Sequence, residues 1–139
     1  MTKTYKKIIT YTDGGSRGNP GPASIGVVIK DEDGKSIQTH KECIGNTTNN
    51  QAEYKALLKA IEMAQDLGAQ EVECYLDSEL VVKQMRREYK VKDEGLAKLF
   101  VLIWNLGASF PKISYHHVRR EHNKEADALV NEALDEQCG

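Results

Sequence analysis

The sequence has 139 residues, of which 40% are hydrophobic and 29% are charged, and its formal net charge at pH 7 is −2. This length suits one compact domain, residues 1–139, which can bury about two-thirds of the surface that its unfolded chain exposes. The composition excludes a disordered chain. The longest apolar run, residues 99–104, is far too short to span a membrane.

The N-terminus and the cysteines indicate the compartment. The first seven residues include three lysines and no long apolar stretch follows them, so we expect no signal peptide. Cys43, Cys74 and Cys138 form no C-x-x-C pair, and their odd number argues against a disulfide framework. We therefore expect free thiols in a cytoplasmic protein, with no membrane partner and a monomeric state.

The first third of the chain predicts three antiparallel strands. Residues 7–12 are rich in strand-forming side chains, and the following Asp13-Gly14-Gly15 predicts a sharp turn. A loop over residues 16–22 leads to a second strand at residues 24–29. A hairpin turn at residues 31–34 then leads to the returning strand at residues 36–44.

The rest of the chain alternates helices with strands. Thr48 is a predicted N-cap with Gln51 at the spacing of a capping box, and apolar residues then recur at helical spacing as far as Gly68. Further elements are expected in the order strand 71–76, helix 78–88, polar connection 89–95, helix 96–106, strand 113–118 and helix 123–136.

This order predicts an α/β fold. The helical crossovers make the first, fourth and fifth strands parallel, so the five-stranded mixed sheet has three antiparallel strands followed by two parallel ones. Helices should cover both faces of the sheet, and the first and fourth strands should be neighbours.

This arrangement is expected to bring four acidic residues together at one end of the sheet. Asp13 ends the first strand and Asp77 ends the fourth, and the crevice of an open α/β sheet lies beyond such strand ends. Glu53 and Asp127 lie in the first turns of two helices that can reach the same crevice. Carboxylates so close together repel one another, which favours a site for divalent cations with oxygen ligands. Two such ions about 4 Å apart can support an in-line phosphoryl displacement.

Each acid also has a purely structural explanation. Asp13 suits a turn, Asp77 suits a helix entry, and acids in first helical turns interact favourably with the helix dipole. Four such coincidences at one sheet end are less probable than one shared site. The sequence has no zinc-ligand spacing, phosphate loop or dinucleotide-binding glycine motif.

Four segments together resemble the signature blocks of type 1 ribonuclease H. They are Y-T-D-G-G-S-R-G-N-P-G (11–21), T-T-N-N-Q-A-E-Y (47–54), L-D-S-E-L-V (76–81) and N-K-E-A-D-A-L (123–129). The resemblance covers residues 8–135 and implies the ribonuclease H-like fold. It implies an endonuclease that hydrolyses the RNA strand of RNA–DNA hybrids with two Mg²⁺ or Mn²⁺ ions, leaving 5′-phosphate and 3′-hydroxyl ends. The metal-binding catalytic acids are then Asp13, Glu53, Asp77 and Asp127.

The resemblance also implies substrate contacts. One set lies along the minor groove at the RNA strand, where a protein senses 2′-hydroxyls: Gly14, Gly15, Ser16, Asn49, Asn50 and Gln51. Asn19 and Thr48 match positions that hold a phosphate of the DNA strand. These residues also have structural explanations. Thr48 can serve as a plain N-cap, and Asn49 and Asn50 can be turn residues before the helix. Glu79 replaces a glutamine that is common in the family.

Two departures from the family pattern affect the expected activity. Longer relatives carry a basic, tryptophan-containing protrusion between the second and third helices, where this chain has only residues 89–95. Lys90 and Lys92 replace it in part, so we expect weaker hybrid binding. His122 lies closer to Asp127 than the family's loop histidine does, and is either a catalytic residue for product release or a surface histidine.

Three other functions compete with ribonuclease H activity. A resolvase or transposase core shares the acids but lacks the T-T-N-N-Q-A-E-Y block that contacts RNA. A catalytically silent module that binds hybrid or double-stranded RNA would have lost an acid, and a small-molecule α/β domain would need a phosphate loop. Cleavage of double-stranded RNA and the choice between Mg²⁺ and Mn²⁺ stay open at this stage.

Overall fold

A computed structural model describes residues 5–138 of the chain. The elements, in chain order, are β1 (Lys7–Ser16), β2 (Gly21–Asp31), β3 (Ser36–Thr47), α1 (Asn49–Asp66), β4 (Glu71–Leu76), α2 (Glu79–Met85), α3 (Glu94–Gly107), β5 (Lys112–His117) and α4 (Lys124–Glu136), with a 3₁₀ turn at Arg120–His122. No helix in residues 5–138 is long and apolar enough to cross a membrane.

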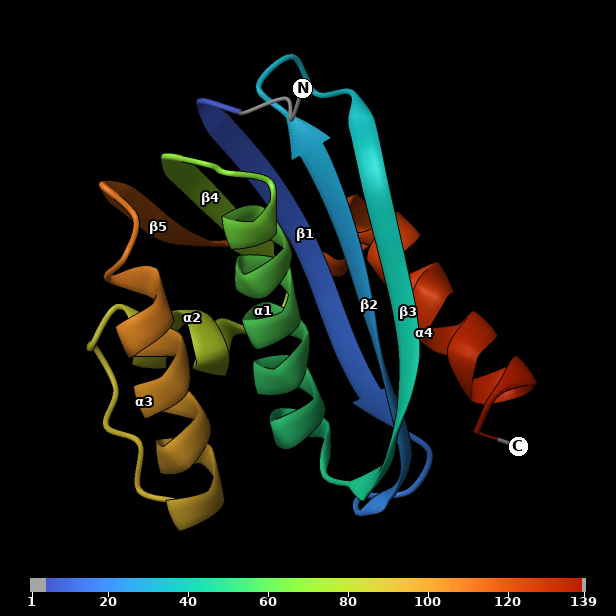
Figure 1. Cartoon of the computed structure of the whole chain (residues 1–139). Helices are drawn as coiled ribbons and strands as arrows, with labels where there is room; N and C mark the ends of the chain where they lie inside the picture. The colour runs from blue at the N-terminus through green and yellow to red at the C-terminus, as the bar shows by residue number, and fades with distance from the viewer. Residues whose placement is uncertain (1–4, 139) are drawn as a thin grey trace.

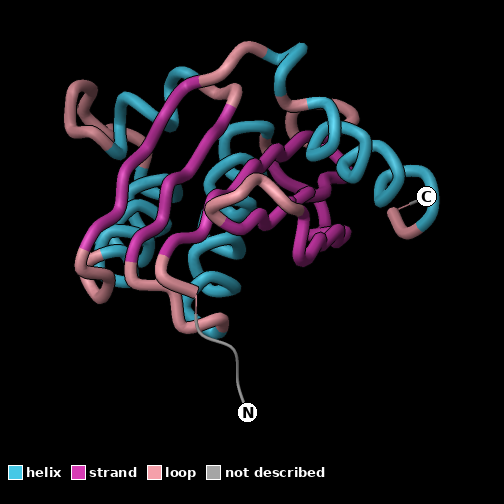
Figure 2. The backbone as a smooth tube through the Cα atoms, turned by 90° about the horizontal axis from the view of Figure 1, so that it is seen from above, coloured by secondary structure: helices cyan, strands magenta, loops and turns pink. Residues whose placement is uncertain are grey.

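The strands form one sheet in the order β3-β2-β1-β4-β5. β1 is antiparallel to β2, and β2 to β3, whereas β1, β4 and β5 are mutually parallel. α1 packs against β1 and β2 on one face with α3 beside it, and α4 covers β2 and its neighbours on the opposite face (Figures 1 and 2). The predicted mixed sheet, its strand directions and its two helical layers are confirmed.

The main core lies between α1 and the sheet. On β4 the residues at alternate positions, Val72, Cys74 and Leu76, are buried, because successive side chains of a strand point to opposite faces. They meet Leu57 and Ile61 of α1, which are also fully buried. This packing holds α1 against the sheet, mainly at β1 and β2.

The predicted end of the first strand was wrong. β1 continues past Asp13 to Ser16, and Gly14 and Ser16 pair with Ile25 and Ala23 of β2. The parallel pairing with β4, however, stops at Thr12. Asp13 therefore follows directly after the parallel part of β1, and the glycines after it extend the hairpin with β2 instead of turning.

Helix ends also differ from the predictions. Thr48 caps α1 by accepting a hydrogen bond from the Gln51 N–H, as predicted, but the Gln51 side chain accepts from the Thr47 hydroxyl, so the expected capping box is not formed. α2 ends at Met85 instead of residue 88. α3 begins two residues earlier than expected, because the Asp93 carboxylate caps it at the Leu96 N–H.

The expectation of three free thiols was wrong. Cys43 and Cys138 form a disulfide, and only Cys74 among the described cysteines is free and buried. The two half-cystines are 95 residues apart in the chain. They meet because β3 forms the sheet edge beside the end of α4, a contact that cysteine spacing alone does not reveal.

Candidate metal centre and nucleic-acid interface

Two glycines allow helices to approach the sheet closely at the acids. A Cβ on Gly14 would lie 2.3 Å from the main chain of Ala52, and a Cβ on Gly26 would lie 2.4 Å from the Ala126 oxygen. Gly26 is the cross-strand partner of Asp13. The missing side chains bring α1 and α4 against β1 and β2 directly beside Asp13.

Three acids meet at this place. Asp13 from β1, Glu53 from α1 and Asp77 after β4 each present a carboxylate oxygen within 4.8 Å of the others. Asp13 and Glu53 are buried, and Asp77 is partly exposed. The Gly14 N–H donates to the Glu53 Oε1 at 2.6 Å, which fixes that carboxylate against β1.

The cluster is electrostatically unfavourable for ionised carboxylates. Burial raises the pKa of Glu53 well above its ordinary value, and the nearby Asp13 and Asp77 raise it further. Burial is also the main cause of the raised pKa of Asp13, to which Asp77 and Asp127 add. A bound cation would offset this repulsion.

Two neighbours stabilise the ionised form of the Asp77 carboxyl. Burial raises the pKa of Asp77, whereas a hydrogen bond with Asn123 and the charge of Arg120 lower it. Asn123 is itself buried and donates through its amide nitrogen to the Thr12 carbonyl at 2.8 Å. Asn123 thus ties the start of α4 to β1 beside the acids.

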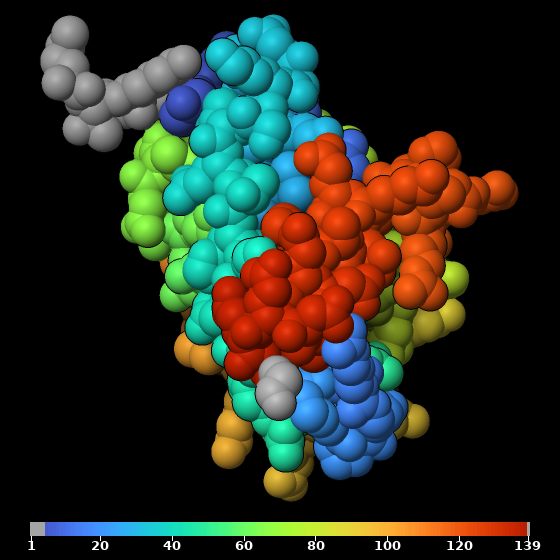
Figure 3. All heavy atoms as spheres, turned by 90° about the vertical axis from the view of Figure 1, so that its right-hand side faces the viewer, coloured from blue at the N-terminus to red at the C-terminus, as the bar shows by residue number. Residues whose placement is uncertain are grey.

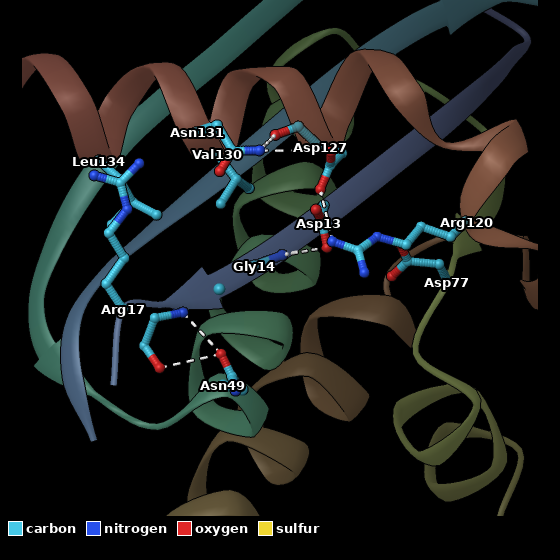
Figure 4. Close-up of a pocket in the computed structure, with 12 residues that line it drawn as sticks. Asp13, Gly14, Arg17, Asn49, Asp77, Arg120, Asp127, Val130, Asn131 and Leu134 are labelled. Atoms are coloured by element: carbon cyan, nitrogen blue, oxygen red, sulfur yellow. Dashed lines mark hydrogen bonds and ion pairs between the residues drawn. The ribbon is translucent and has the colours of Figure 1, made fainter. Parts of the chain in front are cut away.

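Asp127 faces the same pocket from α4. It lines the pocket together with Asp13 and Asp77, and its Oδ1 lies 3.6 Å from Nη2 of Arg120 (Figure 4). It lies outside the group of three acids whose oxygens are within 4.8 Å of one another. Arg120 belongs to a segment that projects beside α4, drawn in orange next to the red helix in Figure 3.

The donor set fits a hard divalent cation. Such ions prefer several carboxylate oxygens, which this cluster offers from three elements. In addition, Oε2 of Glu53 is buried without a hydrogen-bond partner among the described residues. An unpaired buried acceptor is costly, and a metal ligand bond at this oxygen would satisfy it.

Some of the expected substrate-binding residues line the same pocket. They are Gly14, Gly15, Ser16 and Asn49. Oδ1 of Asn49 accepts hydrogen bonds from the N–H and the hydroxyl of Ser16, at 2.8 Å and 3.1 Å. The end of β1 and the start of α1 therefore form one polar surface beside the acids.

Other expected residues lie beside this pocket without lining it. The side chain of Asn19 accepts a hydrogen bond from the Asn49 N–H at 3.0 Å, which ties its loop to the start of α1. Thr48 is occupied as the N-cap, Gln51 is bonded to Thr47, and Asn50 is exposed. Their predicted contacts with nucleic acid remain predictions.

His122 is not brought to the acids in this structure. It is exposed, and it lines a separate recess with Tyr11, Lys30 and Glu121 instead of the pocket that holds Asp13. It lies in the 3₁₀ turn before α4, where the sequence predicted an irregular loop.

Sequence reasoning assigned no role at the site to three residues that the structure places there. Arg120 and Asn131 line the pocket with the acids, and Asn123 is buried beneath it. Arg120 lies outside the four signature blocks of the family resemblance. Asn123 was predicted as the first residue of the last helix, whereas α4 begins at Lys124 and Asn123 is its N-cap residue, without a side-chain cap bond.

Comparison with known proteins assigns the family. The family model described as reverse transcriptase-like matches residues 11–133. The chain is 44% identical to ribonuclease HI of Halobacterium salinarum over 130 residues, covering 94% of this chain and 65% of that protein. It is 31% identical to a ribonuclease H of Clostridium botulinum, covering 94% of this chain and 97% of that one.

Solved structures agree with these relatives. LC11-RNase H1 in complex with an RNA/DNA hybrid superimposes with a TM-score of 0.90 at 48% identity, covering 95% of this chain and 99% of that one. The crystal structure of RNase H1 from Halobacterium salinarum gives a TM-score of 0.91 at 44% identity, covering 93% and 98% of the two chains.

Relative length differs among these proteins. Three mycobacterial relatives are 44% identical, but the chain spans only 36% of their length. The relative from Clostridium botulinum, by contrast, matches over nearly its full length. On the family model, these identities and the shared fold, the chain belongs to the ribonuclease H family.

Proposed function

We propose that this protein is an endonuclease that hydrolyses the RNA strand of RNA–DNA hybrids. The observation that carries this proposal is the meeting of Asp13, Glu53 and Asp77 from three different elements beside a polar surface. It is supported by the structural likeness to LC11-RNase H1, which was solved in complex with an RNA/DNA hybrid.

The proposed cofactor is a pair of Mg²⁺ ions, with Mn²⁺ as a substitute. Asp13, Glu53 and Asp77 would hold them together with Asp127, the fourth acid at the pocket. When bound, the ions would activate a water and stabilise the leaving oxygen, giving 5′-phosphate and 3′-hydroxyl ends. The Gly14 N–H and Asn123 hold the acids in position for this role.

The polar surface of β1 and α1 is the proposed site of strand discrimination. Gly14, Gly15 and Ser16 would contact the RNA strand through its minor groove, with Asn49, Asn50 and Gln51 beside them. Asn19 and Thr48 would hold a phosphate of the DNA strand, which fixes position without reading sequence. We propose that one chain suffices, since all four acids come from a single monomer.

One assay tests the proposal directly. Labelled hybrid, double-stranded RNA, single-stranded RNA and double-stranded DNA are each incubated with Mg²⁺, Mn²⁺ or a chelator, and product ends are identified by their reactivity with kinase and ligase. Cleavage of the hybrid only in the presence of metal, with 5′-phosphate ends, is expected. Undiminished activity in chelator or equal cleavage of double-stranded DNA would contradict it, and the double-stranded RNA arm decides whether that duplex is a second substrate.

A further inference from the structure

A second pocket lies away from the acids, between the end of α2, the end of α3 and β5. It has a volume of about 420 Å³, which is within the range of ordinary ligand sites. Met85, Ala108 and Ile113 contribute apolar surface, and Trp104 forms a wall that is 42% exposed. Figure 1 shows these three elements side by side at the β5 edge of the molecule.

β5 is an edge strand, and this pocket runs along its free edge. Its neighbour in the sheet is β4 on one side only. The Tyr115 carbonyl faces outward, since it accepts a hydrogen bond from Nε of Arg86 at 2.7 Å. Because alternate residues of a strand direct their main-chain groups to the same side, the N–H of Tyr115 and the main-chain groups of Ile113 face outward as well. Unpaired edge groups are a template for an added strand.

Arg87 provides a second, independent indication. It has a φ of 64°, the left-handed conformation, at the position after the α2 cap where glycine is usual. A side chain at such a position costs stability, so its presence favours a role for the side chain. The Arg87 guanidinium lies 5.6 Å from the centre of the Trp104 ring. Among residues 5–138 the ion pair at this place joins Arg86 to Glu88, and Arg87 takes part in none.

We propose that this pocket binds an extended acidic segment of a partner protein. The segment adds as a strand to β5, places a bulky apolar side chain between Trp104 and Ile113, and directs a carboxylate to Arg87. A peptide N–H can replace Arg86 at the Tyr115 carbonyl, and an acidic side chain of the segment can then compete with Glu88, whose Oε2 lies 3.9 Å from Nη1 of Arg86, for that guanidinium. Strand addition uses main-chain hydrogen bonds for affinity and alternate side chains for specificity.

Nucleic acid fits this surface less well. Phosphates could bind the two arginines, but they would leave the outward main-chain groups of β5 unused. The Trp104 ring already stacks on Phe100 at 5.7 Å and lies beneath Arg87, which disfavours it as a platform for base stacking.

The test uses the single tryptophan of the chain, Trp104, as a reporter inside the pocket. A library of short random peptides is displayed and selected on the intact protein, and the enriched peptides are synthesised and titrated while Trp104 fluorescence is recorded. Acids alternating with bulky apolar residues are expected, with a saturable change in Trp104 emission. Methylation of alternate peptide nitrogens should abolish binding.

Variants distinguish binding at the pocket from nonspecific attraction of an acidic peptide to surface cations. Arg87→Gly should weaken peptide binding at least about tenfold, a loss of about 1.4 kcal/mol, while its melting temperature stays the same or rises because the left-handed strain is gone. Arg87→Gln removes the charge without altering that backbone and should weaken binding similarly. Lys98→Ala removes an exposed cation of α3 that does not line the pocket, and it should bind like the parent.

Several results would overturn the proposal. These are the absence of enriched peptides, enriched peptides without acids, binding that leaves Trp104 emission unchanged, and equal affinity of the parent and both Arg87 variants. Displacement of the peptide by a single-stranded oligonucleotide with the same Trp104 response would assign the pocket to nucleic acid instead.

Discussion

Each carboxylate of the acid cluster is destabilised by the others when no cation is bound. Burial and the neighbouring acids together raise the pKa of Asp13 and Glu53, so ionising these carboxyls costs more free energy in the folded protein than in the unfolded chain. Residues that form such a cluster contribute to function at the expense of stability. A substitution among them can therefore remove activity without lowering stability.

Asp77→Asn should therefore abolish cleavage without loss of stability. The substitution keeps the side-chain shape and removes one charge from a repelling group, so the melting temperature of the metal-free protein should stay equal or rise. The cleavage rate should fall by more than about a hundredfold, beyond the effect typical of a residue that only supports a metal ligand. Substantial activity at saturating metal would show that Asp77 is not a ligand.

His122 offers a prediction in which sequence and structure point in different directions. A histidine can shuttle a proton near neutral pH, and the proposed product-release role predicts that His122→Ala lowers kcat by about tenfold to a hundredfold. The structure places His122 in a recess apart from Asp13, so a movement of the segment before α4 would be required.

Parallel pH–rate profiles of His122→Ala and Glu121→Gln distinguish the two neighbours. Glu121 is the rival because it lies in the same 3₁₀ turn. If His122→Ala matches the parent from about pH 6 to 9, the histidine is a surface residue. If only Glu121→Gln changes the profile, the proton or metal role belongs to that acid.

Between elements, the approach of α4 to β2 decides where Asp127 lies. A Cβ on Gly26 would lie 2.4 Å from the Ala126 oxygen and 2.9 Å from the Leu129 Cβ, both in the helix that carries Asp127. Gly26→Ala should thus push α4 away, lower the free energy of unfolding by about 1–3 kcal/mol and reduce cleavage.

Gly107→Ala is the matched control for that prediction. Its Cβ would lie 3.1 Å from the Tyr115 hydroxyl, in α3 and away from the acids. Its stability is measured in the same chemical denaturation experiment, and its kcat should stay near that of the parent. Full activity of Gly26→Ala at a temperature where it is folded would show that the position of α4 is not critical.

The short connection between α2 and α3 carries the third expected contact with the hybrid. Lys90 and Lys92 are exposed there, and each phosphate contact releases counterions when it forms. Changing both to alanine should raise KM for the hybrid and flatten its dependence on salt, with kcat little changed. An unchanged slope of affinity against salt concentration would mean that both lysines only face solvent.

At the scale of the whole molecule, apolar patterns and turn signals predicted the chain order of the elements, because each element buries one apolar face. The hairpin turns and helical crossovers predicted which strands are antiparallel and which are parallel. The missed features depend on contacts between distant segments. β1 extends to Ser16 because β2 continues to pair with it, and the Cys43–Cys138 disulfide forms where β3 meets α4. α2 ends at a left-handed Arg87, where the sequence has no glycine to indicate a stop.

The residues of the candidate site also divide into those that could be predicted from the sequence and those that depend on contacts between distant segments. Asp13, Glu53 and Asp77 could be predicted to meet from the ends of β1 and β4 and the start of α1, because parallel strand ends share one edge. Arg120 and Asn123 could not, since their roles depend on how the segment before α4 lies against Asp127 and Thr12.

Metal binding should change the stability and the charge of the whole protein. Two divalent ions would shift the formal net charge from −2 to −2 + 4 = +2, which favours approach to nucleic acid. A ligand that binds only the folded state at a concentration a hundredfold above its Kd stabilises it by about 2.7 kcal/mol. For this chain length, saturating Mg²⁺ should therefore raise Tm by roughly 5 to 15 °C over the value in chelator. The Asp77→Asn variant should show a smaller rise in Tm with Mg²⁺ than the parent. If NaCl of the same ionic strength raises the Tm of the parent as much as Mg²⁺ does, the effect is screening of the acids and not metal binding.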